Sequence, residues 1–294
     1  MVDPVSIAVI AGSAGGAAGK LVEKAWGVGE RWLDSYFRDH QPNAVATAKA
    51  NSLDFLAQLA YKVKALEAAA TDEATKERIR DALDDPDFSA TLQDALIASA
   101  RTSNSEKHDM LSRLVAERLR QPPETIVALA IPLATQAVSK LTPRQMRLLG
   151  LATFVKHIRP RPLPPNIDPQ HFAQWYDQWL TSGLQPFAPL EPVHSPDLTH
   201  IQALSCVQTS IVGYFILEKV LSPNLDEPYT WDYQHFIEQT PLGPALNQCW
   251  ESGLKLIMLT SVGQLIGVMV HDRLTGSPTE IDWETYAPAA PAAP

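Results

Sequence analysis

The first segment whose residues could do chemistry is the glycine-rich run IAVIAGSAGGAAGKL, residues 7–21. A phosphate-binding loop of the type GxxxxGK followed by Ser or Thr surrounds a phosphate with backbone amides and holds Mg²⁺ with a hydroxyl group. Counting back from Gly19 and Lys20, the first glycine position holds Ala14, and Leu21 stands where the hydroxyl is needed. We therefore predict that this segment binds no nucleotide.

The same segment suits a helix that packs closely against another helix. Small residues recur at every fourth position in two stripes, Ala8, Gly12 and Gly16, and Ala11, Gly15 and Gly19. Such stripes let helix backbones touch, both in membranes and in tight bundles. Residues 4–19 carry no charge, but 16 residues fall just short of the roughly 20 that span a bilayer.

The stretch that follows, residues 20–38, has an apolar and a charged face at helical spacing. Trp and Tyr on an apolar face suit a membrane interface, although most amphipathic helices simply cover a protein core. Two interpretations stay open: a hairpin that docks on the core or on another copy, and a membrane-active element. The predicted oligomer or membrane contacts are Gly12, Gly15, Gly16, Gly19, Trp26, Trp32, Tyr36 and Phe37.

A basic stretch lies between Glu124 and Asp168, which are separated by no other acidic residue. We predict that Lys140, Arg144 and Arg147 share one helix face. This face could contact an anionic surface such as lipid, a phosphate-bearing ligand, or the acidic C-terminal part of the chain. The alternative is a solvated face, which is the usual role of a charge run.

No set of residues matches a nucleophile–base or metalloprotease signature. His171, Trp175 and Trp179 fall on one helix face, a pattern more typical of an aromatic stripe covering a core than of a ligand cage. Cys206 and Cys249 lie far apart without a CxxC pair, which favours a reducing compartment and gives no zinc site. We predict a protein that is not an enzyme and has no cofactor or metal ion, although a helical protein can hide a site that no motif reveals.

The net charge of −9 is unevenly distributed. Residues 40–196 contain 17 basic and 17 acidic side chains, whereas residues 197–294 contain three basic and 11 acidic ones. An acidic C-terminal third would repel phosphates, so we predict no nucleic-acid partner. The N-terminal residues lack the basic region of a secretory signal, and we therefore expect the protein inside the cell.

Helical signals dominate the middle of the chain. Glycine is missing from residues 30–149, and apolar residues step by three and four along residues 53–66 and 110–119. Asn104 or Ser105 should cap the second of these helices, and Pro132 should break or kink a later one.

Further along the chain, Thr142–Pro143 should start a helix, and residues 198–221 should form a long helix. Residues 254–259 suit a short strand or a helix, and Thr260 or Ser261 should cap a last helix through Leu274.

These patterns predict an all-α fold, a multi-helix bundle with one short strand or hairpin near residues 254–270. We expect five regions along the chain. They are a Gly-rich and amphipathic segment (1–40), a helical bundle (41–158), a Pro-rich connector with a short aromatic helix (159–197), an acidic helical part (198–286) and a disordered tail (287–294).

Three segments together carry a family resemblance: SEKHDMLSRLVAERL at Ser105–Leu119, KLTPRQMRLLGLATFV at Lys140–Val155, and LIMLTSVGQLIG at Leu256–Gly267. They resemble bacterial abortive-infection alpha-like proteins, a largely uncharacterised helical family linked to phage defence. None of the segments contains a catalytic signature, so no catalytic residue carries over. The resemblance implies a cytosolic factor in antiviral defence, such as a cell-death effector.

We therefore predict a non-enzymatic effector of a bacterial anti-phage defence system of the abortive-infection type. It would oligomerise and insert its N-terminal helices into a membrane. Its partners would be further copies of itself, membrane lipid and a sensor protein encoded nearby. It would reside in the cytoplasm and be recruited to the inner membrane on activation. The alternative is a soluble helical adaptor that binds a protein partner through its aromatic connector or basic face.

Overall fold

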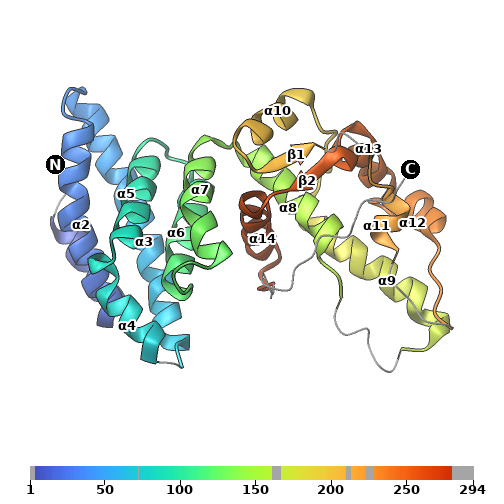
Figure 1. The fold of residues 1–294 in the computed structure, drawn as a ribbon, viewed down its shortest axis with the longest axis horizontal. Coiled ribbons are helices and arrows are strands. Elements are labelled where there is room, and N and C mark those ends of the chain that lie inside the picture. The colour runs from blue at the N-terminus through green and yellow to red at the C-terminus, as the bar shows by residue number, and fades with distance from the viewer. Residues whose placement is uncertain (1–3, 72, 161–166, 210–212, 223–227, 280–294) are drawn as a thin grey trace. The chain divides into compact units, whose positions relative to one another are not determined.

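A computed structural model describes residues 4–71, 73–160, 167–209, 213–222 and 228–279 (Figure 1). The described part of the chain contains 14 α-helices and one two-stranded sheet, so the predicted all-α fold is confirmed. The chain divides into two compact units, unit 1 (Met1–Pro143) and unit 2 (Arg144–Pro294). This division falls earlier than the bundle boundary at residue 158 that the sequence suggested.

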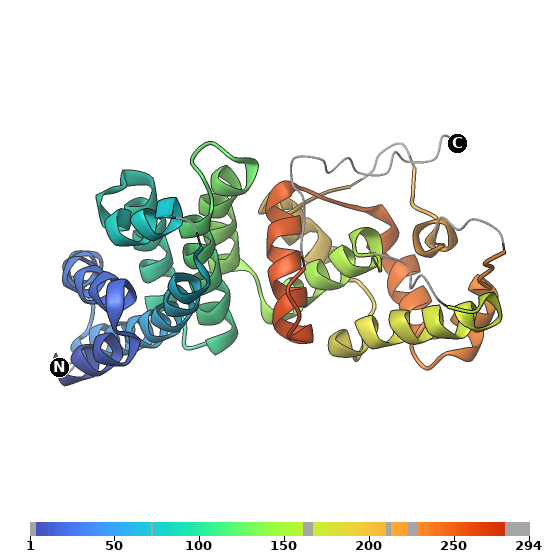
Figure 2. The same ribbon diagram turned by 90° about the horizontal axis from the view of Figure 1, so that it is seen from below.

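Unit 1 is built from helices alone among its described residues. They are α1 (Pro4–Ala14), α2 (Gly16–Tyr36), α3 (Pro42–Ala69), α4 (Glu73–Asp81), the 3-10 helix η1 (Ala82–Asp84), α5 (Pro86–Ala100), α6 (Ser105–Arg120) and α7 (Ile126–Lys140). Figure 2 shows α1 and α2 lying against each other at the N-terminal end of the unit.

The ends of these helices follow from their side chains. Asn104 caps α6 by accepting a hydrogen bond from the Lys107 amide at 3.0 Å, as the sequence predicted. Thr125 caps α7 by accepting from the Ala128 amide at 3.2 Å. The predicted break at Pro132 is wrong, because α7 continues through it. One face of α7 is buried in unit 1, and this packing outweighs the hydrogen bond that proline removes.

Helix α3 lies at the centre of unit 1, where it packs against α2, α5 and α6. Its residues Phe55, Leu56, Leu59 and Val63 are fully buried. The helical face predicted for residues 53–66 is therefore the face that enters the core.

Unit 2 continues the chain with shorter elements. They are α8 (Pro143–His157), α9 (Pro169–Leu184), η2 (Gln185–Phe187), α10 (Ser195–Ala203), β1 (Val207–Thr209), α11 (Leu217–Leu221), α12 (Tyr233–Gln239), α13 (Gly243–Ser252), η3 (Leu254–Leu256), β2 (Ile257–Leu259) and α14 (Ser261–Thr275). Helix α8 starts at the predicted Thr142–Pro143 signal, and the predicted tail at residues 287–294 lies outside the described residues.

The small sheet explains one wrong prediction. Strands β1 and β2 pair antiparallel, with Val207 opposite Leu259, so the strand expected near residue 257 is confirmed. The single helix predicted for residues 198–221 is wrong, because its middle supplies the partner strand. Ser205 has a φ of 57°, which ends the helical path after α10. Thr260 then caps α14, as predicted, by accepting from the Gly263 amide at 3.2 Å.

The core of unit 2 is aromatic. Phe172 and Tyr176 of α9 are fully buried and stack with ring centroids 5.8 Å apart. The Tyr176 hydroxyl donates to the Leu221 carbonyl at 2.7 Å, and Trp231 meets its ring edge-on at 5.2 Å. The stripe predicted in this helix is only partly buried, since Trp175 and Trp179 are half-buried and His171 is exposed.

Candidate functional site

The N-terminal hairpin, defined here as α1 and α2, contains most of the residues that the sequence singled out. Helix α1 has no charged residue. Ile7 and Ala14 are its buried side chains within residues 7–14, and Val9 is 62% exposed. Helix α1 therefore lies on the outside of unit 1, and only a narrow face with Ile7 and Ala14 is buried against it.

The two helices meet at a sharp break. Gly15 has φ 65° and ψ −177°, and Gly16 also has a positive φ. A backbone with such a φ and an extended ψ is reached almost only by glycine, so the glycine pair makes the reversal possible.

Two side chains from α3 contact this break. The Glu67 carboxylate accepts hydrogen bonds from the amides of Ala17 and Ala18, at 3.2 and 3.3 Å. The Lys64 ammonium donates to the Ser13 carbonyl at 2.9 Å. Each charge suits its helix end, an anion at the start of α2 and a cation at the end of α1. Neither Glu67 nor Lys64 could be predicted from the sequence, because no local pattern shows that α3 will pass beside the glycines.

The small-residue stripes are divided between a contact and an open groove. A Cβ added to Gly19 would lie 2.5 Å from the Ala11 carbonyl oxygen, so this glycine permits the close approach of α1 and α2. Gly12, Gly15 and Gly16 are exposed. A groove of about 450 Å³ runs along this side and is lined by Ile7, Ala8, Ala11, Gly12, Gly15, Gly16, Gly19, Lys20 and Glu23.

The apolar face of α2 docks on the core of unit 1. Leu21, Val22 and Leu33 are buried, and Phe37, just beyond the helix, is 8% exposed beside Ala48 and Ala100. The remaining aromatic side chains are less covered: Trp26 and Trp32 are half-buried and Tyr36 is exposed. The docking interpretation therefore describes α2 in this structure. Among the described residues, no helix has both the length and the apolar character needed to cross a membrane.

The predicted basic stripe does not lie on one helix. Lys140 is the last residue of α7, whereas Arg144 and Arg147 belong to α8, because Leu141 and Thr142 end the first helix. Arg144 bonds within unit 2, at 2.9 Å to Glu191 and 3.0 Å to Asp197. The prediction of one helix face is wrong, since the three charges lie on two helices. A contact of these residues with an anionic surface stays a prediction.

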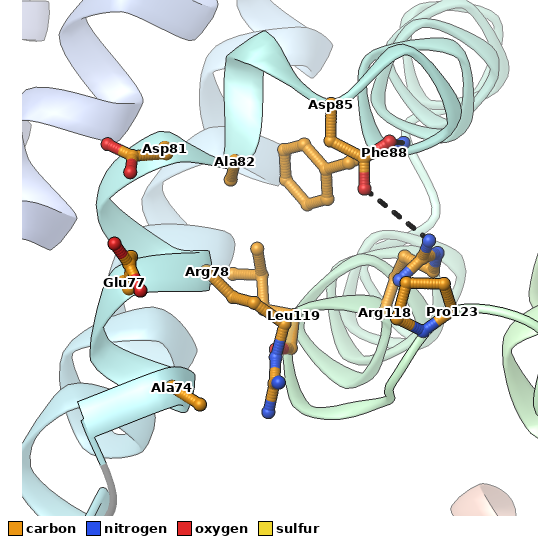
Figure 3. Close-up of a pocket in the computed structure, with 10 residues that line it drawn as sticks. All are labelled: Ala74, Glu77, Arg78, Asp81, Ala82, Asp85, Phe88, Arg118, Leu119 and Pro123. Atoms are coloured by element: carbon orange, nitrogen blue, oxygen red, sulfur yellow. Dashed lines mark hydrogen bonds and ion pairs between the residues drawn. The ribbon is translucent and has the colours of Figure 1, made fainter.

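A second groove, of about 400 Å³, lies beside α4, α5 and α6 (Figure 3). Arg118 is buried and bonds Asp87 at 2.7 Å and Asp85 at 3.5 Å. Arg78 donates to the Leu119 carbonyl at 3.2 Å. Figure 3 shows Glu77 on the side away from Arg118. Both arginines therefore stabilise unit 1: Arg78 links α4 to α6, and Arg118 links α6 to the start of α5.

The C-terminal end of α8 gathers basic groups in a buried setting. The Lys156 ammonium donates to the Ile257 carbonyl at 2.7 Å and lies 4.0 Å above the Phe215 ring and 4.7 Å above the Trp250 ring. Burial lowers the pKa of Lys156 to about 7. Burial, together with the neighbouring charges of Lys156 and Arg159, lowers the pKa of His157 to about 4. No local pattern indicates this environment, because Phe215 and Trp250 are distant from Lys156 in the chain.

The remaining candidates for chemistry are structural. Burial raises the pKa of Cys206 to about 12 and that of Cys249 to about 11, so both thiols stay protonated near neutral pH. Across the residues that the structure describes, no group of three or more His, Cys, Asp or Glu side chains could hold a metal ion.

Comparison with known proteins gives a family and no activity. Neither the curated proteins nor the solved structures include a match to the chain. Residues 19–231, more than half of the chain, match the model of an uncharacterised family whose description reads only "-like" and specifies no activity. Nothing in this match links the family to abortive infection. The chain belongs to this uncharacterised family.

Proposed function

We propose that the protein is a non-enzymatic effector of a bacterial anti-phage defence system, one that oligomerises and inserts its N-terminal segment into a membrane. The observation that carries the proposal is the position of α1, a helix without charge that lies on the outside of unit 1 with Val9 62% exposed. The resemblance of three helical segments to abortive-infection alpha-like proteins supports the defence role.

The proposal requires the N-terminal segment to leave its resting position. Helix α1 has 11 residues, about 16 Å at 1.5 Å per residue, against a hydrocarbon layer of about 30 Å. Several copies would have to assemble for so short a segment to perturb a bilayer. The exposed Gly12, Gly15 and Gly16 then offer the close helix–helix contact.

The test compares three proteins at graded expression in bacteria: the wild type, Gly12→Leu and Gly27→Leu. Neither glycine has an atom within 4 Å of an added Cβ, so both substitutions should leave the resting fold intact. We expect the wild type and Gly27→Leu to enter the membrane fraction and dissipate the membrane potential, and Gly12→Leu to lose both effects. Deleting residues 1–14 should abolish both as well. If the wild type stays out of the membrane at every expression level while cells still die, the insertion mechanism is wrong.

A second candidate function is a helical adaptor, and a different surface favours it. Ile126, Leu129 and Leu133 follow one face of α7 and are each more than half exposed. An apolar stripe of this kind on a folded helix is typical of protein–protein contacts. Under this alternative, Leu129→Asp abolishes the cellular phenotype, and deletion of residues 1–14 leaves it unchanged.

A further inference from the structure

The break between α1 and α2 replaces backbone hydrogen bonds with side-chain bonds. In an unbroken helix the Ala17 amide would donate to the Ser13 carbonyl, and the Ala18 amide to the Ala14 carbonyl. In the structure, both amides donate to Glu67, and the Ser13 carbonyl accepts from Lys64. Two side chains of α3 thus take the place of the partners that the break removes.

Helical bonding continues on each side of this break. The Gly15 amide donates to the Ala11 carbonyl at 2.9 Å, and the Gly19 amide donates to the Gly15 carbonyl at 2.7 Å. The interruption is therefore confined to the few residues between Gly12 and Ala18. The backbone change that would close it falls at Gly15 and Gly16, the two residues with positive φ.

The two arrangements are close to balanced in hydrogen bonds. Straightening the segment would give up three bonds to Lys64 and Glu67 and form the backbone bonds of an unbroken helix in their place. Few apolar contacts oppose the change, since Ile7 and Ala14 are the buried side chains among residues 7–14. Glycine reaches the positive-φ conformation of Gly15 and Gly16 readily, so the bent form carries little backbone strain and neither form is strongly favoured by the backbone.

We propose that the break is a two-state switch held in its bent form by Lys64 and Glu67 of α3. When this clamp is released, residues 4–36 form one continuous helix that carries the uncharged residues 4–14 away from unit 1, while α2 stays docked. The link between this switch and membrane insertion rests on the proposed function, while the switch itself does not. Any partner that competes for Glu67 or Lys64 would act as the trigger.

Glycine substitutions test the switch because they affect the two forms differently. Gly15→Ala is strained in the bent form, with its φ of 65° and ψ of −177°, and fits a straight helix. Gly19→Ala places a Cβ 2.5 Å from the Ala11 carbonyl in the bent form, and this contact disappears when α1 swings away. Glu67→Ala removes the clamp directly. Gly27→Ala is the matched control, since this exposed glycine of α2 lies outside the small-residue stripes and its Cβ meets nothing within 4 Å.

The readout is the distance between spin labels at Ala8→Cys and Asn43→Cys in the full-length protein, both at exposed helical positions. We expect a single distance in the wild type and in Gly27→Ala. The other three variants should show a second population, longer on the order of 10–20 Å, because eight helical residues span about 12 Å. Circular dichroism would verify that each variant is folded. If none of the three folded variants gains the longer distance, the switch does not exist.

The same variants then separate this inference from the proposed function. Leakage of dye from anionic liposomes should increase for Gly15→Ala, Gly19→Ala and Glu67→Ala, and not for Gly27→Ala. A longer distance without leakage or membrane binding supports the switch and overturns the insertion mechanism. Leakage without a longer distance supports insertion and overturns the switch.

Discussion

Two regions of the molecule use charged side chains in the same way, with opposite consequences. At the break after α1, Lys64 donates to the Ser13 carbonyl, and at the end of α8, Lys156 donates to the Ile257 carbonyl. Arg159 adds bonds to the carbonyls of Val155 and Ile158. In both places a cation serves carbonyls that the surrounding backbone leaves without an amide partner.

The difference lies in what surrounds the two cations. Lys64 is exposed, and the break beside it holds only small residues. Lys156 lies against the rings of Phe215 and Trp250, and Trp250 is itself 1% exposed. Bonds at the surface exchange with water at little cost, whereas burial adds hydrophobic free energy and prevents exchange. A hydrogen bond from lysine to a carbonyl can therefore break and re-form readily where it is exposed, and it persists where it is buried.

The largest expected effect comes from removing the Trp250 side chain, which packs beside Lys156 in unit 2. Trp250→Ala should lower the free energy of unfolding by about 3–5 kcal/mol, because it leaves a cavity and removes the bond from the indole to the Phe215 carbonyl. Urea unfolding of the full chain measures the change, and Trp250→Phe, which retains most of the apolar volume, should cost less. The Ala8–Asn43 distance in unit 1 should stay at its wild-type value. A similar cost for both variants would show that the cavity is not the cause.

The next effect concerns pH. Burial lowers the pKa of Lys156 from 10.5 to about 7, so between these values the unfolded chain binds more protons than the folded chain. The free energy of unfolding should therefore rise with pH across this window, with a slope of at most about 1.4 kcal/mol per unit. Below pH 7 the cost of burying the charge is present in full. The contacts with the two rings and with the Ile257 carbonyl favour the ammonium and oppose the lowering of its pKa, which narrows this window.

Urea unfolding between pH 7 and pH 9 would measure this slope in the wild type and in Lys156→Met. The variant should be less dependent on pH, and its stability relative to the wild type should be greatest at the acidic end. His157 titrates in a separate window, because its pKa is lowered from 6.5 to about 4. Equal slopes for the two proteins would mean that Lys156 keeps its proton throughout.

The helices and their buried faces could largely be predicted from the sequence. The helices of unit 1 followed from local signals, such as the Asn104 cap and the periodicity around Leu56, because those signals act within one helix. A short aromatic helix was likewise expected in the Pro-rich connector and is present as α9, although its fully buried rings are those of Phe172 and Tyr176. Local patterns therefore predicted the helix type and the buried face.

Tertiary pairings were not predictable in this way. The strand at Val207–Thr209 forms because β2 supplies hydrogen bonds from 50 residues further along the chain. The basic stripe failed for a smaller reason, as the two residues between α7 and α8 move Lys140 off the helix of Arg144. Glu67 and Lys64 became meaningful only once α3 was seen beside the glycines. A single sequence carries no record of such long-range contacts.

The smallest expected effect comes from weakening the surface clamp at one of its two bonds. Lys64→Met removes the exposed bond to the Ser13 carbonyl, which should contribute no more than about 1 kcal/mol. Because α1 can open without unfolding unit 1, the global unfolding free energy should hardly change. The opening should instead appear in the labelling of a cysteine placed at the buried Ile7, which should accelerate about fivefold or less. The two native thiols should label slowly, since burial raises the pKa of both.

Lys62→Met is the matched control, because this lysine lies on α3 two residues earlier and bonds Asp109 of α6 at 2.7 Å. Its loss should lower the global stability of unit 1, since Lys62 and Asp109 are both largely covered, and should leave the labelling of Ile7→Cys near its original rate. The two lysines thus have different expected effects: Lys64 affects the opening of α1, and Lys62 affects the stability of unit 1. If Lys62→Met accelerates labelling as much as Lys64→Met does, then the opening of α1 depends on the overall stability of the bundle around α3. The Lys64 bond would then be an ordinary surface contact, and the clamp would rest on Glu67.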